Sequence, residues 1–226
     1  MTTTTASESK AKGPVNDLLI SAGSHVMEPA DLWTSRVPKG LRDQAPTFPS
    51  EGSDQSKPGG WDPTERLKEM AVDGVSLEVL YATRGMTLFR IENVALQEAC
   101  VRTFNDWLIE YCSVAPDRLF GVSTISLYNV DNAIAEMTRT RNAGMVGAMI
   151  WQVPHPDLPF TSDHYDRLWD AAQSLGMPIH LHILTGFDYS AIGGGRGDGI
   201  ESHRGSVNLK LASVTNSMFD LIFSGA

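Results

Sequence analysis

Two histidines in the run PIHLHIL, residues 178–184, are the clearest indication of chemistry in this sequence. His180 and His182 are two positions apart, so on a strand both side chains project from the same face. Neutral imidazole is a good ligand for zinc and similar divalent ions. An imidazole in an apolar strand is costly to bury without a partner. The pair therefore indicates either a metal or catalytic site, or two histidines that hydrogen-bond to neighbours on a half-polar sheet face.

His25 ends a second apolar run, LLISAGSH, residues 18–25. The residue two positions earlier, on the same face of a strand, is Gly23, which has no side chain to offer a metal. Taken alone, His25 is either a metal ligand or, more commonly, a hydrogen-bonded residue at a strand end. Glu28 follows three residues later and precedes Pro29. It could orient a histidine, but we favour a structural role as the cap of the following turn.

The other histidines and the glycine-rich segment give weaker signals. For His155, His164 and His203, capping and substrate contact stay open, and solvent exposure is the expectation. The segment GGGRGDG, residues 193–199, lacks the spacing of a phosphate-binding loop. It is expected to be either a mobile lid over the site or a plain flexible loop. No G-x-S-x-G motif is present, so serine-nucleophile chemistry has no support.

The elements that must position these residues alternate between short apolar runs and longer helical patterns, which is typical of parallel strands joined by crossover helices. The expected strands are residues 18–25, 75–82, 119–126, 146–152 and 178–184; the expected helices are 63–70, 92–114, 130–142, 163–175 and a last one through 207–221. Residues 34–62 have no sustained period and are expected to form a long excursion from the first unit. The predicted class is α/β.

Composition limits the partners. The 226 residues carry a formal net charge of −9, which argues against nucleic acid and acidic membranes, so small molecules are the expected ligands. The two cysteines, Cys100 and Cys112, fall in one predicted helix and cannot bridge, which suits a reducing compartment. No run is long enough for a secretory signal or a membrane span, so a cytoplasmic protein is expected. A transit peptide is the alternative for the N-terminus, although the first residues contain no arginine.

Four segments, in chain order, carry a family resemblance: SAGSHVMEPADLW, GGWDPTERLKEMAVDGVSLEVLYAT, FNDWLIEYCSVAPDRLFGVSTISL and YDRLWDAAQSLGMPIHLH. With them the chain resembles the amidohydrolase-related family, whose members include metal-dependent hydrolases and nonoxidative decarboxylases similar to aminocarboxymuconate semialdehyde decarboxylase. The resemblance implies a (β/α)8 TIM-barrel fold with a divalent metal, zinc or manganese, at its carboxyl face. About the first five β/α units are expected here, in one domain over residues 17–226 behind a disordered tail, residues 1–16.

The resemblance also assigns roles to residues. The first strand of such proteins carries an acidic residue or histidine and then a histidine; these two places are Gly23 and His25 here. The fifth-strand metal ligand corresponds to His182, and His180, deeper on the same face, is the catalytic candidate. Expected substrate contacts at other strand ends are Tyr81, Trp151 and Gln152, although core packing explains Tyr81 equally well. The family's late histidine and late aspartate would lie beyond Ala226.

The expected activity is that of a metal-dependent hydrolase or a nonoxidative decarboxylase acting on a small carboxylated or cyclic substrate, such as a lactone or amide. The alternative is a noncatalytic, truncated relative or one part of an assembly, with the metal weakly bound or absent. Five strands would leave two sheet edges with free backbone groups. We therefore expect a homo-oligomer or a partner segment that covers those edges.

Overall fold

The computed structural model describes residues 18–49, 57–187 and 200–226. The predicted tail, residues 1–16, and the glycine-rich segment, residues 193–199, lie outside this part of the chain, as does the side chain of His203.

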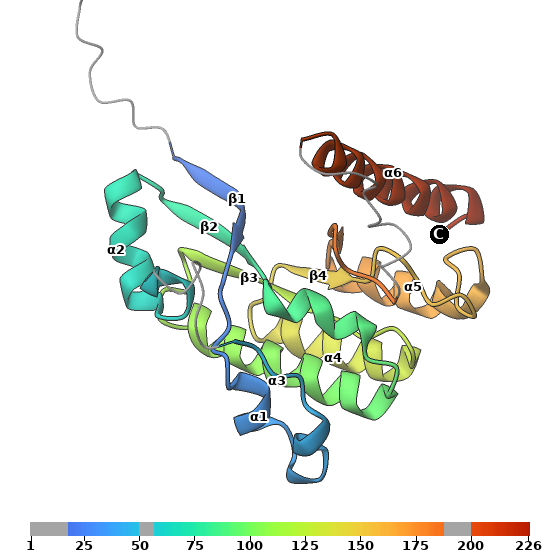
Figure 1. Ribbon diagram of the computed structural model, residues 1–226, viewed down its shortest axis with the longest axis horizontal. Helices are drawn as coiled ribbons and strands as arrows, with labels where there is room; N and C mark the ends of the chain where they lie inside the picture. Colours follow the sequence, from blue (N-terminus) through green and yellow to red (C-terminus); the bar gives the residue numbers. More distant parts are fainter. Residues whose placement is uncertain (1–17, 50–56, 188–199) are drawn as a thin grey trace, which may run out of the picture.

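A single sheet of five parallel strands forms the centre of the molecule (Figure 1). The strands are β1 (Ile20–His25), β2 (Leu77–Tyr81), β3 (Leu119–Thr124), β4 (Gly147–Ile150) and β5 (Ile179–Leu181). Each lies inside one of the five predicted runs, and each pairs with the next strand along the chain. Parallel strands in sequential order form the wall of a (β/α)8 barrel, so five units of that fold are confirmed.

Helices connect successive strands, as predicted. They are α2 (Pro63–Asp73), α3 (Val94–Cys112), α4 (Val130–Asn142) and α5 (Asp166–Leu175), with short 3₁₀ turns η4 (Arg84–Arg90) and η5 (Asp163–Tyr165) at two helix entries. The Asp62 carboxylate caps α2 by accepting the Thr64 N–H. Helices α2 and α5 end at Gly74 and Gly176, with φ of 70° and 55°, which glycine adopts without a Cβ penalty.

The described residues of the excursion between the first two strands include the short helical pieces α1 (Leu32–Arg36), η1 (Lys39–Gln44) and η3 (Pro58–Gly60). Its anchor is Trp33, which is fully buried and donates its indole N–H to the Cys100 carbonyl of α3 at 3.0 Å. Tyr111 of α3 donates to the Gly59 carbonyl at the other end of the excursion. A segment without periodicity is therefore held against α3 by two tertiary contacts, one made by the Trp33 side chain and one by the Tyr111 side chain.

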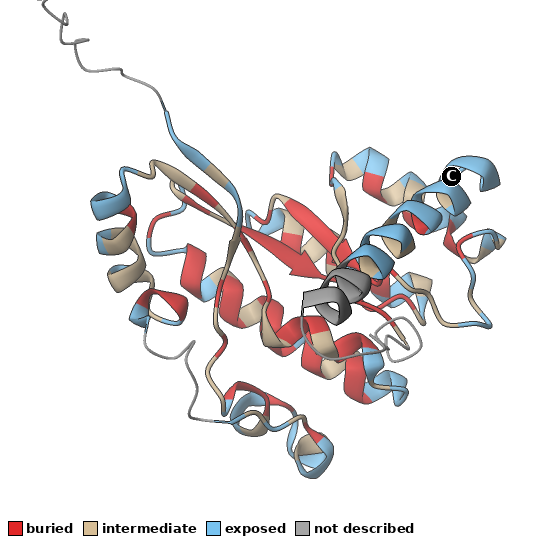
Figure 2. Ribbon diagram, turned by 45° about the horizontal axis from the view of Figure 1, so that its top comes forward, coloured by how far each residue is buried: buried red, intermediate tan, exposed pale blue. Residues whose placement is uncertain are grey.

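The apolar core lies between the sheet and the helices α3 and α4, where the buried residues concentrate (Figure 2). Leu80 and Val122 of the strands and Phe104 and Leu108 of α3 are fully buried. Cys100 and Cys112 are buried in α3 and free, as predicted. Burial raises the pKa of each thiol to about 12.

The last helix, α6 (Ile200–Ser224), lies on the other side of the sheet from α3 and α4 (Figure 1). Ser217 of this helix is buried, and its hydroxyl donates to the Gln152 carbonyl just after β4 at 2.6 Å. Several large apolar side chains of α6 are exposed: Leu209, Leu211, Met218, Phe219, Ile222 and Phe223. No described helix combines the length and the apolarity that crossing a membrane requires.

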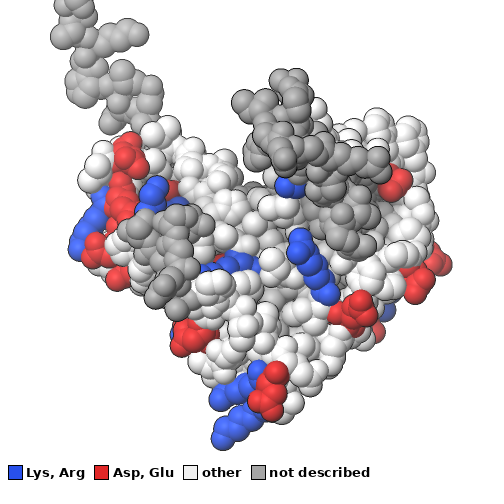
Figure 3. All heavy atoms as spheres, in the orientation of Figure 1, with Lys and Arg blue, Asp and Glu red and all other residues white. Residues whose placement is uncertain are grey.

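Acidic and basic side chains are interspersed on the face of the molecule shown in Figure 3, and no extended basic surface appears there. This distribution agrees with the overall charge of −9. A surface without concentrated positive charge offers little attraction to a phosphate backbone.

Candidate metal centre

His25 and His182 meet although they are far apart in the sequence. Their Nε2 atoms lie 3.2 Å apart, and the rings are edge to face with centroids 5.0 Å apart. His25 is the last residue of β1, and His182 directly follows β5, which is shorter than the predicted run 178–184. The sheet therefore curls enough to bring the carboxyl ends of its two edge strands into contact.

Backbone carbonyls fix the orientation of both rings. His25 Nδ1 lies 2.8 Å from the Ala82 carbonyl, and His182 Nδ1 lies 2.6 Å from the Ile183 carbonyl. Because a carbonyl oxygen only accepts, each Nδ1 carries the proton and donates it. In the neutral rings both Nε2 lone pairs then face the same point, with no proton between them. Metal-ligating histidines typically donate their other ring N–H to a carbonyl or carboxylate in this way.

The donor pair fits a divalent cation. Two nitrogen ligands about 2.1 Å from one ion, at an angle of roughly 100°, would be separated by about the distance observed here. A catalytic zinc normally has three protein ligands. The described residues bring no group of three His, Cys, Asp or Glu side chains together for a metal. His25 and His182 therefore form a two-nitrogen site.

The surroundings of His25 lower its pKa and so favour its neutral form. Burial lowers its pKa, against the raising effect of the Ala82 carbonyl, and the nearby charges of His182 and Arg66 lower it further. Arg66 of α2 donates to the His25 carbonyl at 3.1 Å and pairs with Glu78 of β2 at 2.5 Å, with both side chains mostly buried. A neutral imidazole is the form that binds a metal, so this environment favours ligation.

His180 and Tyr81 form a second pair beside the first. Tyr81 Oη lies 2.9 Å from His180 Nδ1, which joins β2 to β5 across the inner face of the sheet. The His180 ring sits over Gly147 of β4: a Cβ added at Gly147 would be only 2.2 Å from His180 Nε2. Burial lowers the pKa of His180 and raises that of Tyr81.

All four side chains line one cavity of about 520 Å³. Its other lining residues are Ala22, Gly23, Ile179 and Leu181 of the sheet, and Val214 and Met218 of α6. The walls are thus mainly apolar, and the polar groups are the three imidazoles and one phenol. Such a lining suits an aromatic or aliphatic ligand with one polar end.

Trp151 and Gln152 do not line this cavity. Trp151 is fully buried and meets the Tyr128 ring edge to face at 5.1 Å. Gln152 is fully buried as well. With its amide oriented so that each end meets a complementary group, it donates to the His182 carbonyl at 3.2 Å and accepts from the Val214 N–H at 2.9 Å. Gln152 therefore connects the turn after β5 to α6.

Glu28 has a structural role, as the sequence favoured, but it caps a distant turn and not the turn that directly follows it. Its fully buried carboxylate accepts the N–H groups of Thr83, Arg84 and Gly85, at 2.8 to 3.1 Å, and so caps the entry to η4. Burial raises the pKa of Glu28, and the backbone N–H groups oppose that effect.

The expected exposure of His155 and His164 is wrong. His155 packs edge to face on Phe187, with ring centroids 4.1 Å apart, and His164 Nε2 bonds to the Leu127 carbonyl at 2.9 Å. Both are partly buried because loops after β3 and β5 fold over them.

Arg66 and Gly147 are further residues at the site that were not expected from the sequence. Nothing in the helical pattern of α2 distinguishes Arg66 from its neighbours. A glycine inside a strand pattern does suggest a close approach, so Gly147 carried a signal that could have been used.

Five sequential parallel strands with histidines at the carboxyl edge define a (β/α)-barrel protein with a candidate metal centre. The chain belongs to the amidohydrolase family, whose profile matches residues 25–207. It is 29% identical over 127 residues to gamma-resorcylate decarboxylase of Rhizobium sp. (strain MTP-10005), and the match covers 52% of this chain and 37% of that protein. The relatives of this chain are enzymes. The match spans little more than a third of the length of gamma-resorcylate decarboxylase.

Two solved structures show the same fold. An amidohydrolase from Mycobacterium avium subsp. paratuberculosis gives a TM-score of 0.74 at 17% identity, covering 93% of this chain and 70% of the other. A 5-carboxyvanillate decarboxylase from Novosphingobium aromaticivorans, solved with bound manganese, gives 0.62 at 18% identity, covering 95% and 66%.

Proposed function

We propose that this chain acts in a metal-dependent, nonoxidative decarboxylase whose substrate is an aromatic carboxylate. The observation that carries this proposal is the approach of His25 Nε2 and His182 Nε2 to 3.2 Å at the carboxyl edge of the sheet. Relatives named as decarboxylases of gamma-resorcylate and 5-carboxyvanillate support the choice of reaction and substrate class.

His25 and His182 would hold the cation, zinc or manganese. When bound, a divalent ion supplies a positive charge that holds the carboxylate and polarises the adjacent oxygen. The two backbone carbonyls at Nδ1 keep both imidazoles in the ligating tautomer. Arg66 fixes the strand end that carries His25.

The other cavity residues would bind and orient the substrate. Val214 and Met218 of α6 offer apolar surface to an aromatic ring and exclude water from it. Loss of carbon dioxide leaves a ring carbon that must take up a proton. The Tyr81 hydroxyl and the His180 ring, bonded to each other at 2.9 Å, are the protic groups of this cavity and would deliver it.

The test compares metal-loaded protein with ligand variants. Metal-free protein is incubated with Mn²⁺ or Zn²⁺, and carbon dioxide release from 2,6-dihydroxybenzoate and 5-carboxyvanillate is measured alongside bound metal. We expect metal-dependent release that His25→Ala and His182→Ala abolish and that His164→Gln, a histidine bonded to a loop carbonyl, retains.

Three outcomes would contradict the proposal. Protein that retains no metal would show that these histidines do not form a metal site. Full activity in His25→Ala would show that His25 is not a required ligand. Hydrolysis of lactones or amides without release of carbon dioxide would instead support the hydrolase reaction.

A further inference from the structure

We propose that Thr185 is a positioning residue of the metal centre. Its hydroxyl holds the turn that follows β5 in a strained form, and that form keeps the His182 ring in the tautomer whose Nε2 lone pair faces His25. The inference rests on the proposed role of His182 as a metal ligand, but it concerns the protein before a metal binds. It gives a task to two fully buried polar residues, Thr185 and Gln152, that the proposed reaction leaves unused.

Residues 182–185 form a tight turn, which the Thr185 N–H closes by donating to the His182 carbonyl at 3.3 Å. Leu184, the third residue of this turn, has a φ of 74°. Among the residues that the structure describes, no other residue except glycine has a positive φ. A φ near +80° at this position is that of a type II turn, where glycine is usual because other side chains are strained there. The turn is therefore held in a form that its own sequence does not favour.

The strained form of the turn determines where the Ile183 carbonyl points. Turn types I and II differ in ψ of the second residue and φ of the third, the two angles on either side of the peptide group between them. That peptide group carries the Ile183 carbonyl, which lies 2.6 Å from His182 Nδ1. A relaxed type I turn, with a negative φ at Leu184, would rotate this carbonyl away from the ring. His182 Nδ1 would then lose the acceptor that fixes its proton.

The Thr185 hydroxyl supplies the contacts that hold this turn. Its Oγ1 donates to the His182 carbonyl at 2.7 Å and accepts the Gln152 N–H at 3.0 Å. One hydroxyl thus joins the two ends of the turn and attaches them to the chain just after β4. The Gln152 side-chain amide donates to the same His182 carbonyl at 3.2 Å. A strained backbone persists where its surroundings over-determine it, and these buried hydrogen bonds provide that restraint.

The first experiment is ¹⁵N NMR of the imidazole groups in the metal-free protein, at a mildly alkaline pH where neutral histidine predominates. In the natural chain we expect His182 to carry its proton on Nδ1 alone. Thr185→Ser keeps the hydroxyl and should keep this tautomer, whereas Thr185→Val should give a mixture of the Nδ1–H and Nε2–H forms. His164, whose Nε2 bonds to the Leu127 carbonyl, is an internal reference that should not change.

The second experiment measures the affinity for Co²⁺ and the visible spectrum of the bound ion. We expect Thr185→Val to bind Co²⁺ about 10- to 100-fold more weakly than the natural chain, as for other residues that orient a metal ligand. Thr185→Ser should restore both the affinity and the spectrum. Thr138→Val is the matched control, because the Thr138 hydroxyl bonds to the Ile134 carbonyl within α4. Thr185→Ala removes the same hydroxyl without putting a methyl group in its place, and circular dichroism shows whether each variant folds.

A substitution at Leu184 tests the strain. Glycine adopts a φ of 74° without a Cβ penalty, so in Leu184→Gly the turn needs less support from the Thr185 hydroxyl. In that background Thr185→Val should leave His182 mainly in the Nδ1–H form and should cost less Co²⁺ affinity than it costs in the natural chain.

The results separate this inference from the proposed function. Mixed His182 tautomers in the natural chain, or unchanged tautomer and Co²⁺ affinity in Thr185→Val and Thr185→Ala, would overturn the inference, while Co²⁺ binding by the natural chain would still support the metal site. An equally large effect of Thr185→Val in Leu184→Gly would overturn the role of the strained turn. If the tautomers respond as expected but the natural chain binds no Co²⁺, the metal site fails and the link between Thr185 and the His182 tautomer is confirmed.

Discussion

The imidazole of His180 lies directly over Gly147, so that its Nε2 occupies the place where a side chain at 147 would begin. The two residues belong to the neighbouring strands β5 and β4, whose register pairs Met149 with His180. Gly147 is two positions before Met149 and on the same face of the strand. The glycine thus makes room for the ring that Tyr81 holds at its other nitrogen.

Gly147→Ala should displace His180 and break its bond to Tyr81. We expect a loss of about 1–3 kcal/mol in the free energy of unfolding, as for other overpacked sites, measured by urea denaturation. Gly40→Ala is the control, because a Cβ at Gly40 meets nothing within 4 Å. In a His180→Ala background the cost of Gly147→Ala should become small. An unchanged cost there would show that the ring is not the obstacle.

Tyr81→Phe should reduce turnover more than metal affinity. The substitution removes the hydroxyl that bonds to His180 but leaves both Nε2 atoms of the metal site in place. The expected cost in stability is about 0.5–1.5 kcal/mol. Tyr128→Phe is the matched control, since the Tyr128 hydroxyl is buried with no hydrogen-bond partner among the described residues. Equal losses of kcat in both variants would contradict a role for the Tyr81 hydroxyl.

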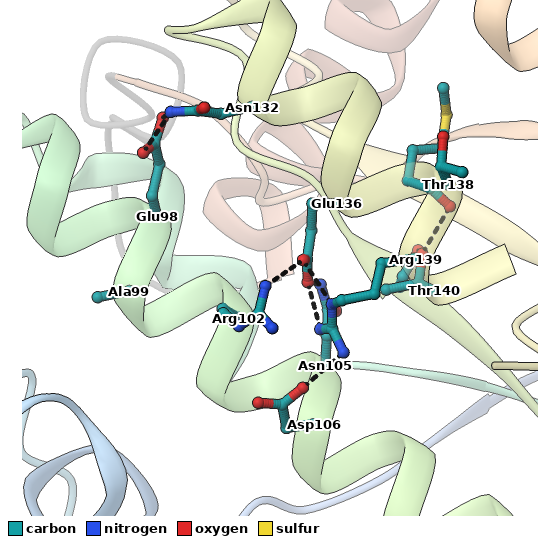
Figure 4. A network of polar contacts seen from close by, with 12 residues as sticks. Glu98, Ala99, Arg102, Asn105, Asp106, Asn132, Glu136, Thr138, Arg139 and Thr140 are labelled. Atoms are coloured by element: carbon teal, nitrogen blue, oxygen red, sulfur yellow. Dashed lines mark hydrogen bonds and ion pairs between the residues drawn. The ribbon is translucent and has the colours of Figure 1, made fainter. Parts of the chain in front are cut away.

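The free energy of unfolding should decrease in acid as Glu136 becomes protonated. Glu136 lies in a polar network between α3 and α4 (Figure 4), where Arg139 donates to it at 2.6 and 2.8 Å and Asn105 at 2.8 Å. Burial alone would raise the pKa of Glu136, but these bonds and the charges of Arg139 and Arg102 outweigh it and lower the pKa.

The direction of this pH dependence follows from the lowered pKa of Glu136. A folded pKa below the unfolded value of 4.5 contributes stability above about pH 4.5, and this contribution disappears as the pH falls through the folded pKa. Glu136→Gln should cost about 1–3 kcal/mol at pH 7 and flatten the pH dependence of urea unfolding between pH 6 and 3. Asp106→Asn, at a half-exposed partner of Arg139, should have a smaller effect. Parallel pH profiles of Glu136→Gln and the natural chain would contradict this prediction.

Cys100 and Cys112 should resist alkylation in the folded protein. Burial raises the pKa of both thiols to about 12, so the reactive thiolate is scarce at pH 8. Iodoacetamide labelling followed by mass spectrometry should show almost no modification in buffer and two modified cysteines in urea. Rapid labelling without urea would mean that α3 opens readily.

The order of the elements was predictable because the relevant signals are local. Apolar runs and helical periods located all five strands, and Asp73–Gly74 and Gly176 marked where α2 and α5 end. The excursion, residues 34–62, was not predictable in detail. Its conformation depends on the burial of Trp33 and on Tyr111, which are tertiary contacts without a sequence period.

The candidate site was predictable only in part. His180 and His182 share a strand pattern, but no spacing in the sequence relates either residue to His25, which is 157 positions from His182. Their meeting depends on the curl of the whole sheet, and only the family resemblance indicated it. The packing of the His180 ring against Gly147 depends on the register between β4 and β5. The pattern of a single strand does not determine that register.

The sequential pairing of the strands has a consequence for how the site forms during folding. Each strand finds its partner in the next unit of the chain, so the wall can grow one neighbour at a time with short loop closures. The two imidazoles sit on the first and the fifth of these units. We therefore expect their encounter to be among the later folding events, so that a probe of the histidine pair would report that all five strands have assembled.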